Sequence, residues 1–304
     1  MPTDLEQSIF RTIAYFSLFD YPVTAFEIWK WLLMPSAGYQ LVDVRETLTI
    51  SEWLKTRLET QDGFFVLTGR GDMVATRHER FLDATRKFKR LRRACRYLAL
   101  LPTIKMLAVC NTLAWMNTKP ESDIDLFIVV KPGRIWTARL FTVLPFKLLG
   151  LRPMQGAVDP VCFSFFAAAD HLDFRPVRLV KDDIYLAAWI RSLVPVVNRG
   201  DVERMSDANS WVKRAFPNSF GVTVARPHRF VVRSSRLPAE EGSGLVARSV
   251  EHLAKVIQRR RLPAEIKKLA NQDTRVIVSD TMLKFHPNDR RGEILEKLET
   301  LCVH

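Results

Sequence analysis

In the N-terminal part of the chain, hydrophobic residues recur at helical spacing over short stretches. Residues 5–19 carry apolar side chains three and four positions apart, which predicts a helix, and Pro22 follows its end. Thr24 and Glu27 form a capping-box pair that predicts the start of a second helix. A third helix and a hairpin of two short strands are expected at 41–54, 58–60 and 64–68. Three helices closed by a hairpin predict a winged-helix-like domain over residues 1–72.

Residues 73–100 are predicted to form a basic connecting helix with two different faces. One face is basic, with Arg86, Lys89, Arg90, Arg93 and Arg96, and the other is apolar, with Phe88, Leu91, Cys95 and Leu98. One interpretation is a connecting helix whose charged face is solvated. The other is a stripe that contacts nucleic acid, because several Arg on one helical face can follow a phosphate backbone.

The centre of the chain contains apolar runs that are short enough to be buried strands. Residues 104–110, 123–130 and 160–168 are expected to be strands, and an amphipathic helix is expected at 135–150. These elements predict an α+β fold in which residues 101–181 form a central domain with a mixed sheet.

The remaining residues, 182–304, are expected to form a mainly helical C-terminal region. Breaks are expected near Pro195 and Gly200, because neither residue suits a helix interior. The predicted segments are helical residues 182–216, a loop at 217–247, a basic helix at 248–261, a strand at 274–279 and a helix from about residue 289.

The composition is that of a soluble globular protein with a large positive charge. Hydrophobic residues make up 47% of the chain, and 46 Lys and Arg against 33 Asp and Glu give a net charge of +13. This excess favours polyanionic partners such as nucleotides or nucleic acid, although a basic solvated surface has the same composition. The four cysteines are widely spaced and include no C-x-x-C pair, which argues against a disulfide framework or a zinc site.

No membrane span is expected, because charged residues interrupt the longest apolar stretches, 97–116 and 137–151. The N-terminal sequence MPTDLEQS does not have the basic and apolar regions of a signal peptide. With the free-thiol pattern, these features predict a cytoplasmic protein.

Asp123 and Asp125 are the residues that most clearly suggest chemistry. Side chains alternate along a strand, so these two carboxylates are expected on one face at the strand's start. Paired carboxylates bind a hard divalent ion such as Mg²⁺. Such ions can hold and stabilise the attacking and leaving oxygens of a phosphoryl transfer. A D-x-D pair by itself is weak evidence, so the surrounding sequence decides its meaning.

The sequence around this pair is similar to one known fold family. An apolar strand, a short polar turn, a helix-sized insert and then SDIDLFIVV follow one another. This order resembles the nucleotidyltransferase fold of polymerase beta, CCA-adding enzymes and kanamycin-type antibiotic nucleotidyltransferases. The phrases AYFSLFDYPVTAFEIWKWL, NSWVKRAFPN and VSDTMLKFHPNDRR extend the resemblance over most of the chain, to bacterial nucleotidyltransferase-domain proteins with a helical N-terminal module.

The resemblance implies a metal-dependent enzyme that moves a nucleotidyl group from a nucleoside triphosphate to a hydroxyl of an acceptor. It implies that Asp123 and Asp125 bind Mg²⁺ or Mn²⁺. Active members carry a third carboxylate on a neighbouring strand, where this chain offers Ser164. Of the two nearby carboxylates, Asp159 and Asp170, Asp159 is the better candidate for a third metal ligand.

The resemblance also suggests which residues contact the nucleotide. Asn111 and Thr112 occupy the positions of the family's Gly-Ser turn, which cradles the triphosphate. Ser122 and Lys131, at the two ends of the D-x-D strand, are further candidates for nucleotide binding. The alternative function is a catalytically degraded member of the fold that acts as a nucleotide- or nucleic-acid-binding regulator through the basic surface.

Overall fold

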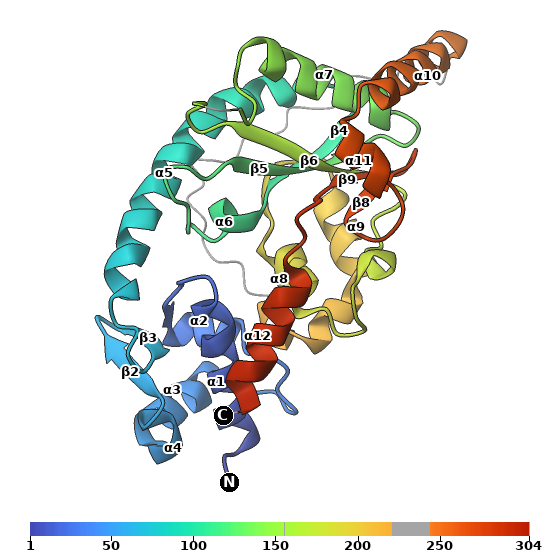
Figure 1. The fold of residues 1–304 in the computed structure, drawn as a ribbon. Helices are drawn as coiled ribbons and strands as arrows, with labels where there is room; N and C mark the ends of the chain where they lie inside the picture. The colour runs from blue at the N-terminus through green and yellow to red at the C-terminus, as the bar shows by residue number, and fades with distance from the viewer. Residues whose placement is uncertain (155, 221–243, 304) are drawn as a thin grey trace.

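The computed structural model describes residues 1–154, 156–220 and 244–303 (Figure 1). In its N-terminal part, short helices pack beside a small antiparallel sheet of strand order β1-β3-β2. The elements are α1 (Asp4–Ser17), β1 (Val23–Thr24), α2 (Ala25–Lys30), α3 (Leu41–Ile50), α4 (Glu52–Lys55), β2 (Leu58–Gln61) and β3 (Phe64–Leu67).

Local sequence signals determine most of these boundaries. Thr24 and Glu27 form the expected capping box of α2. Asp62 and Gly63 have φ angles of 51° and 78°, which the tight β2–β3 turn requires, so the predicted hairpin is confirmed. The predicted helix at 41–54 is instead two helices, because the side chain of Ser51 caps a new one, α4.

A long helix, α5 (Met73–Leu98), connects this part to the rest of the molecule and runs along one side of it (Figure 1). Phe88, Leu91 and Cys95 are buried on its predicted apolar face. The helix also buries two charged side chains, Arg80 and Lys87, which the two-faced pattern did not predict.

A mixed six-stranded sheet, of order β7-β4-β5-β6-β9-β8, forms the centre of the molecule. β5 lies antiparallel to β4 and parallel to β6, so the expected mixed sheet is confirmed. The strands are β4 (Ile104–Val109), β5 (Ile124–Val130), β6 (Val161–Ala168), β7 (Val194–Asn198), β8 (Val276–Val278) and β9 (Met282–Phe285).

The two faces of this sheet are covered by different parts of the chain. Ile124, Leu126 and Ile128 of β5 belong to a core shared with α5 and with the outer helices. Phe127 and Val129 point to the other face, into a core shared with the N-terminal helices. The other helices are α6 (Asn111–Ala114), α7 (Ile135–Leu148), α8 (Ile184–Ser192), α9 (Asp201–Ala208), α10 (Leu245–Arg260), α11 (Ala264–Leu269) and α12 (Arg291–Val303), with 3₁₀ turns at Arg175–Val177, Ser210–Arg214 and Pro217–Ser219.

The region 182–304 differs most from the sequence-based expectation. It contributes three strands to the central sheet, so the sheet continues past the expected domain boundary at residue 181. β7 lies within the segment predicted to be helical, and its Pro195 is tolerated because β7 is an edge strand. β9 was not predicted. Most of the expected loop at 217–247 lies outside the described residues.

The helices that the structure describes include none that is both long and apolar enough to cross a membrane.

Candidate functional site

Asp123 and Asp125 lie where β5 begins, next to the strand β6. Asp125 is the second residue of β5 and stands opposite Cys162 in the parallel pairing of the two strands. By the alternation of side chains, both aspartates project to the face of the sheet that Phe127 also uses. That face is covered by the N-terminal helices and α8, so Asp125 lies between the sheet and these helices, whereas the partly exposed Asp123 lies near Lys87 and Arg152.

Asn111 joins the preceding turn to the carboxylates. Its side-chain Nδ2 donates to Asp125 Oδ2 at 3.0 Å, and its Oδ1 accepts from Trp189 Nε1 at 3.1 Å. Its φ angle is 54°, in the left-handed region that glycine adopts freely and that asparagine tolerates better than most residues. Asn111, at the position where the resemblance implies a glycine, therefore has a glycine-like backbone while its side chain fixes the orientation of Asp125.

Burial without a neutralising partner dominates the electrostatics of this pair. Burial raises the pKa of Asp125 to about 6, and the charge of Asp123 adds to the effect while the Asn111 hydrogen bond opposes it. Burial also raises the pKa of Asp123, against the attraction of Lys87 and Arg152. Among the described residues neither carboxylate forms a salt bridge. The pair is therefore an under-compensated centre of negative charge.

Asp159 is held in a different environment from the one expected of a metal ligand. Its carboxylate accepts hydrogen bonds from Arg86 Nη2 at 2.8 Å, Lys87 Nζ at 2.9 Å and Arg90 Nη1 at 3.1 Å. Burial opposes its ionisation, but the bonds from Arg86 and Lys87 outweigh it and lower the pKa of Asp159. These three cations on α5 already neutralise Asp159, so the structure does not offer it as a third metal ligand beside Asp125.

Ser122 and Lys131 are also placed differently from the nucleotide contacts expected of them. Ser122 Oγ accepts a hydrogen bond from the backbone N–H of Lys119 at 3.0 Å, so the hydroxyl closes the turn before β5. Lys131 follows the opposite end of β5. At roughly 3.3 Å per residue, the six residues from Asp125 to Lys131 span about 20 Å of strand. The structure therefore does not bring Lys131 to the carboxylate pair.

Ser164 occupies the part of β6 where the resemblance leads one to expect a third carboxylate. Its Oγ lies 2.9 Å from His286 Nε2, in the segment after β9. Burial lowers the pKa of His286 to about 4, and the nearby charge of Lys284 acts in the same direction. His286 is therefore neutral at pH 7. Asp170, the other carboxylate considered, is exposed after the end of β6 and contacts His171.

Two cations near the pair were not identified from the sequence. Lys87 is fully buried and donates to the carbonyls of Pro120 and Ser122 at 3.0 and 2.8 Å, so it holds the approach to β5. The charge of Arg152 acts on Asp123, and its Nη1 is buried without a hydrogen-bond partner in the described structure. No local pattern marks either residue, because their contacts form only when distant segments meet.

Within the described residues no group of three or more His, Cys, Asp or Glu side chains is arranged to hold a metal ion. Thr112, the partner of Asn111 in the expected phosphate turn, is exposed, and its carbonyl accepts from the Asn117 N–H at 2.9 Å. The structure thus brings Asn111 to Asp125, and Lys87 links the segment before Asp123 to Asp159, whereas Lys131 lies at the opposite end of β5. Comparisons with protein-family models, curated proteins and solved structures find no match to this chain.

Proposed function

We propose that this protein is a nucleotidyltransferase-fold enzyme that transfers a nucleotidyl group from a nucleoside triphosphate to a hydroxyl of an acceptor. The observation that carries the proposal is the pair Asp123 and Asp125. It lies on one face at the start of a sheet strand, beside a turn whose Asn111 adopts a glycine-like backbone. The sequence order that resembles the family is therefore accompanied by a suitable juxtaposition of the same residues.

The chemistry of this donor set suits Mg²⁺ or Mn²⁺. Mg²⁺ is commonly bound through one or two carboxylates, with water and substrate phosphates supplying the other oxygens. Asp123 and Asp125 provide two, and the raised pKa of both is the mark of a carboxylate pair without a counter-charge. When bound, the ion would neutralise phosphate charge during transfer.

The chain's own residues would orient the nucleotide and compensate charge. Asn111 holds Oδ2 of Asp125 through its Nδ2, and the side chain of Cys162 also hydrogen-bonds this carboxylate. The exposed Thr112 hydroxyl lies on the next residue of the same turn. Arg152 has a buried Nη1 without a partner beside Asp123, and we assign it to a phosphate of the substrate, since planar guanidinium groups suit phosphate.

The N-terminal residues 1–72 complete the proposed architecture. Their helices and their three-stranded sheet follow the element order of a winged helix, and we assign them to that class. Arg80 on α5 joins this module to the turn before β5, because it donates to the Phe19 carbonyl at 3.0 Å and to Asn117 Oδ1 at 3.2 Å. The module is therefore connected to the candidate site in the same polypeptide scaffold.

Calorimetric titration of the full chain with each of the four nucleoside triphosphates and Mg²⁺ tests the proposal. We expect magnesium-dependent binding to the wild type. In the variant Asp123→Asn/Asp125→Asn it should be more than about 100-fold weaker, since even outer-shell partners contribute roughly 10–100-fold to metal affinity. Asp170→Asn, which changes an exposed carboxylate, serves as the control. Equal binding to the double variant, or no binding to the folded wild type, would refute the proposal.

One observation favours a second function at the same site. Ser164 stands where a third carboxylate would help to activate the acceptor, and it is bonded to a neutral histidine. The alternative is thus a regulator that binds the metal–nucleotide complex without transferring it. Incubation with triphosphates labelled at the α-phosphate and a cell extract separates the two functions. Label transferred to an acceptor supports the enzyme, and binding without transfer supports the regulator.

A further inference from the structure

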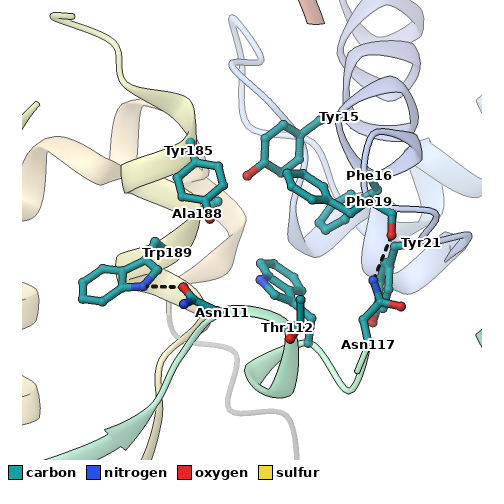
Figure 2. A pocket seen from close by; sticks show the side chains of 11 residues that line it. Tyr15, Phe16, Phe19, Tyr21, Asn111, Thr112, Asn117, Tyr185, Ala188 and Trp189 are labelled. Atoms are coloured by element: carbon teal, nitrogen blue, oxygen red, sulfur yellow. Dashed lines mark hydrogen bonds between the residues drawn. The ribbon is translucent and has the colours of Figure 1, made fainter. Parts of the chain in front are cut away.

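A cavity of about 80 Å³ lies on the side of Asn111 that faces away from the sheet (Figure 2). Its walls come from three separate parts of the chain: the end of α1 and the loop after it, the turn 111–117, and α8. Seven of its eleven lining residues are aromatic: Tyr15, Phe16, Phe19, Tyr21, Trp115, Tyr185 and Trp189. We refer to it as the aromatic cavity.

The tyrosine hydroxyls of the chain fall into two groups. Tyr21, Tyr39 and Tyr97 each donate a hydrogen bond, to Glu27, Asp4 and the Phe141 carbonyl respectively. Tyr15 and Tyr185 line the aromatic cavity, and within the described residues their hydroxyls have no hydrogen-bond partner. Only 3% of Tyr15 is exposed. Both hydroxyls without a protein partner therefore line the same cavity.

Neither hydroxyl is among the described side-chain polar atoms that are buried without a partner, so both are open to the space of the cavity and to a ligand within it. Buried tyrosines usually bond through their polar tips. Figure 2 shows Tyr15 and Tyr185 on neighbouring walls of the cavity. By contrast, the amides of Asn111 and Asn117 already bond to protein groups. The polar groups that a ligand in the cavity can reach thus include the hydroxyls of Tyr15 and Tyr185.

The aromatic cavity adjoins the carboxylate pair through one side chain. Asn111 lines the cavity and also donates to Asp125 Oδ2 at 3.0 Å. Tyr185 is close enough to the same carboxylate for its charge to matter. Burial raises the pKa of Tyr185 to about 12, and the negative charges of Asp289 and Asp125 add to this. Asn111 therefore separates a ligand in the cavity from Asp125 by a single side chain.

We propose that the aromatic cavity binds the hydrogen-bonding edge of a planar heteroaromatic ring. Aromatic walls favour a ring, and the two phenol groups can bond its polar edge. A cavity of about 150 Å³ is known to hold benzene, so a cavity of about 80 Å³ encloses the leading edge of a ring while the rest of the ring lies outside it. The ring would belong to the base of the nucleotide or to an aromatic acceptor. The link to Asp125 rests on the proposed function, whereas the ring-binding property does not.

Tryptophan fluorescence of the full chain provides the measurement, because Trp115 and Trp189 line the cavity. Uridine, cytidine, adenosine, guanosine and phenol are titrated separately in the presence of a chelator. We expect one or more of the nucleosides to bind, which identifies the base of a nucleotide as the ligand. Binding of phenol but of no nucleoside identifies an aromatic acceptor instead, and both results support a ring-binding site.

Three variants test whether binding occurs in this cavity. Tyr15→Phe removes one hydroxyl and should weaken binding by roughly 3- to 10-fold, the range of one hydrogen bond. Ala188→Leu fills the space from α8 and should abolish binding. Tyr97→Phe removes a hydroxyl from α5, outside the cavity, and should leave binding unchanged. Tyr15→Phe keeps the test decisive if Ala188→Leu does not fold.

The proposal is overturned by a lack of binding of all five probes or by unchanged binding in both cavity variants. A chelator separates this proposal from the proposed function in the wild type. It should leave the binding of the ring intact while removing the magnesium-dependent gain of the triphosphate. If the wild type shows ring binding without any magnesium-dependent gain, the cavity assignment stands and the proposed transferase function fails.

Discussion

Asp125 and Asp159 are both carboxylates in the same part of the fold, near the start of adjacent strands, but their surroundings are opposite. Asp159 is almost fully buried and accepts bonds from Arg86, Lys87 and Arg90, all of them on one helix. Asp125 is beside a second aspartate and receives a neutral amide from Asn111. A neutralised carboxylate of the first kind holds α5 against the sheet. Asp125, whose charge is not neutralised, is a position where the binding of a cation is favourable.

The direction of the pKa distinguishes the two sites. The pKa of Asp159 is lowered despite its burial, whereas burial raises the pKa of Asp125 to about 6. We therefore expect Asp159 to contribute to stability and Asp125 to contribute to ligand binding. Removing the partners of Asp159 should damage folding, and removing the charge of Asp125 should damage ligand binding while leaving the fold intact or improving it.

The largest effect is expected when the ion pair of Asp159 is broken. Lys87→Met removes a fully buried ammonium that bonds Asp159 and two carbonyls. This change should lower the free energy of unfolding by about 3–5 kcal/mol, because two carbonyls lose their donor and Asp159 keeps only its bonds from Arg86 and Arg90. Urea unfolding measures this value. Lys89→Met, on the exposed face of the same helix, is the control and should change it by less than about 0.5 kcal/mol. Equal midpoints for the two variants would show that Asp159 is not a structural anchor.

Removing the charge of Asp125 should have the opposite effect and raise the free energy of unfolding at pH 7. Its folded pKa of about 6 exceeds the ordinary 3.8, so its contribution to stability is complete below pH 3.8 and is lost as the pH rises through 6. At pH 7 the ionised group therefore lowers the free energy of unfolding by up to about 3 kcal/mol. Asp125→Asn keeps an acceptor for Asn111 and should be more stable than the wild type at pH 7 but not at pH 4.

Unfolding curves at both pH values, with and without Mg²⁺, measure this difference. Mg²⁺ should stabilise the wild type and narrow its gap to the variant at pH 7, because a ligand that binds the native state shifts the unfolding equilibrium. Asp170→Asn again serves as the exposed control. A variant that is less stable than the wild type at pH 7 would show that Asp125 is already compensated, as Asp159 is, and would remove the contrast between them.

The sequence could predict the strand and the face of the carboxylate pair, because both follow from local alternation. The D-x-D and the apolar residues after it predicted β5, and the two-faced pattern predicted α5. It could not assign Asp159, since its partners lie on α5, more than sixty residues earlier in the chain, and meet it only in the tertiary structure. The burial of Lys87 was not predicted for the same reason, because a lysine within a basic helix gives no local sign of burial.

Strand pairing explains the other differences from the sequence-based predictions. The segment of β7 lies among helical patterns, and it is a strand because Val197 pairs with Leu107 of β4. β9 is only four residues long and is placed between β6 and β8 by pairing on both sides. The aromatic cavity was equally hidden, because its rings come from α1, the turn after β4 and α8. Their tryptophans and tyrosines are ordinary core residues when each segment is considered alone.

The smallest expected effect concerns the basic stripe of α5 and the alternative of nucleic-acid binding. Arg86 and Arg90 of this stripe are bonded to Asp159, while Arg93 lies on the exposed part of the same helix. A cation that contacts a DNA phosphate contributes about 0.9 to the slope of log affinity against log salt. Arg93→Ala should therefore lower that slope by about one for double-stranded DNA at low salt, and Arg86→Ala should change it much less. Titrations over a series of salt concentrations measure both slopes.

If Arg86→Ala reduces the slope as much as Arg93→Ala does, Arg86 must leave Asp159 to bind DNA. The carboxylate would then be a switch between folding and binding rather than a fixed anchor, and its contrast with Asp125 would no longer be one of structure against function.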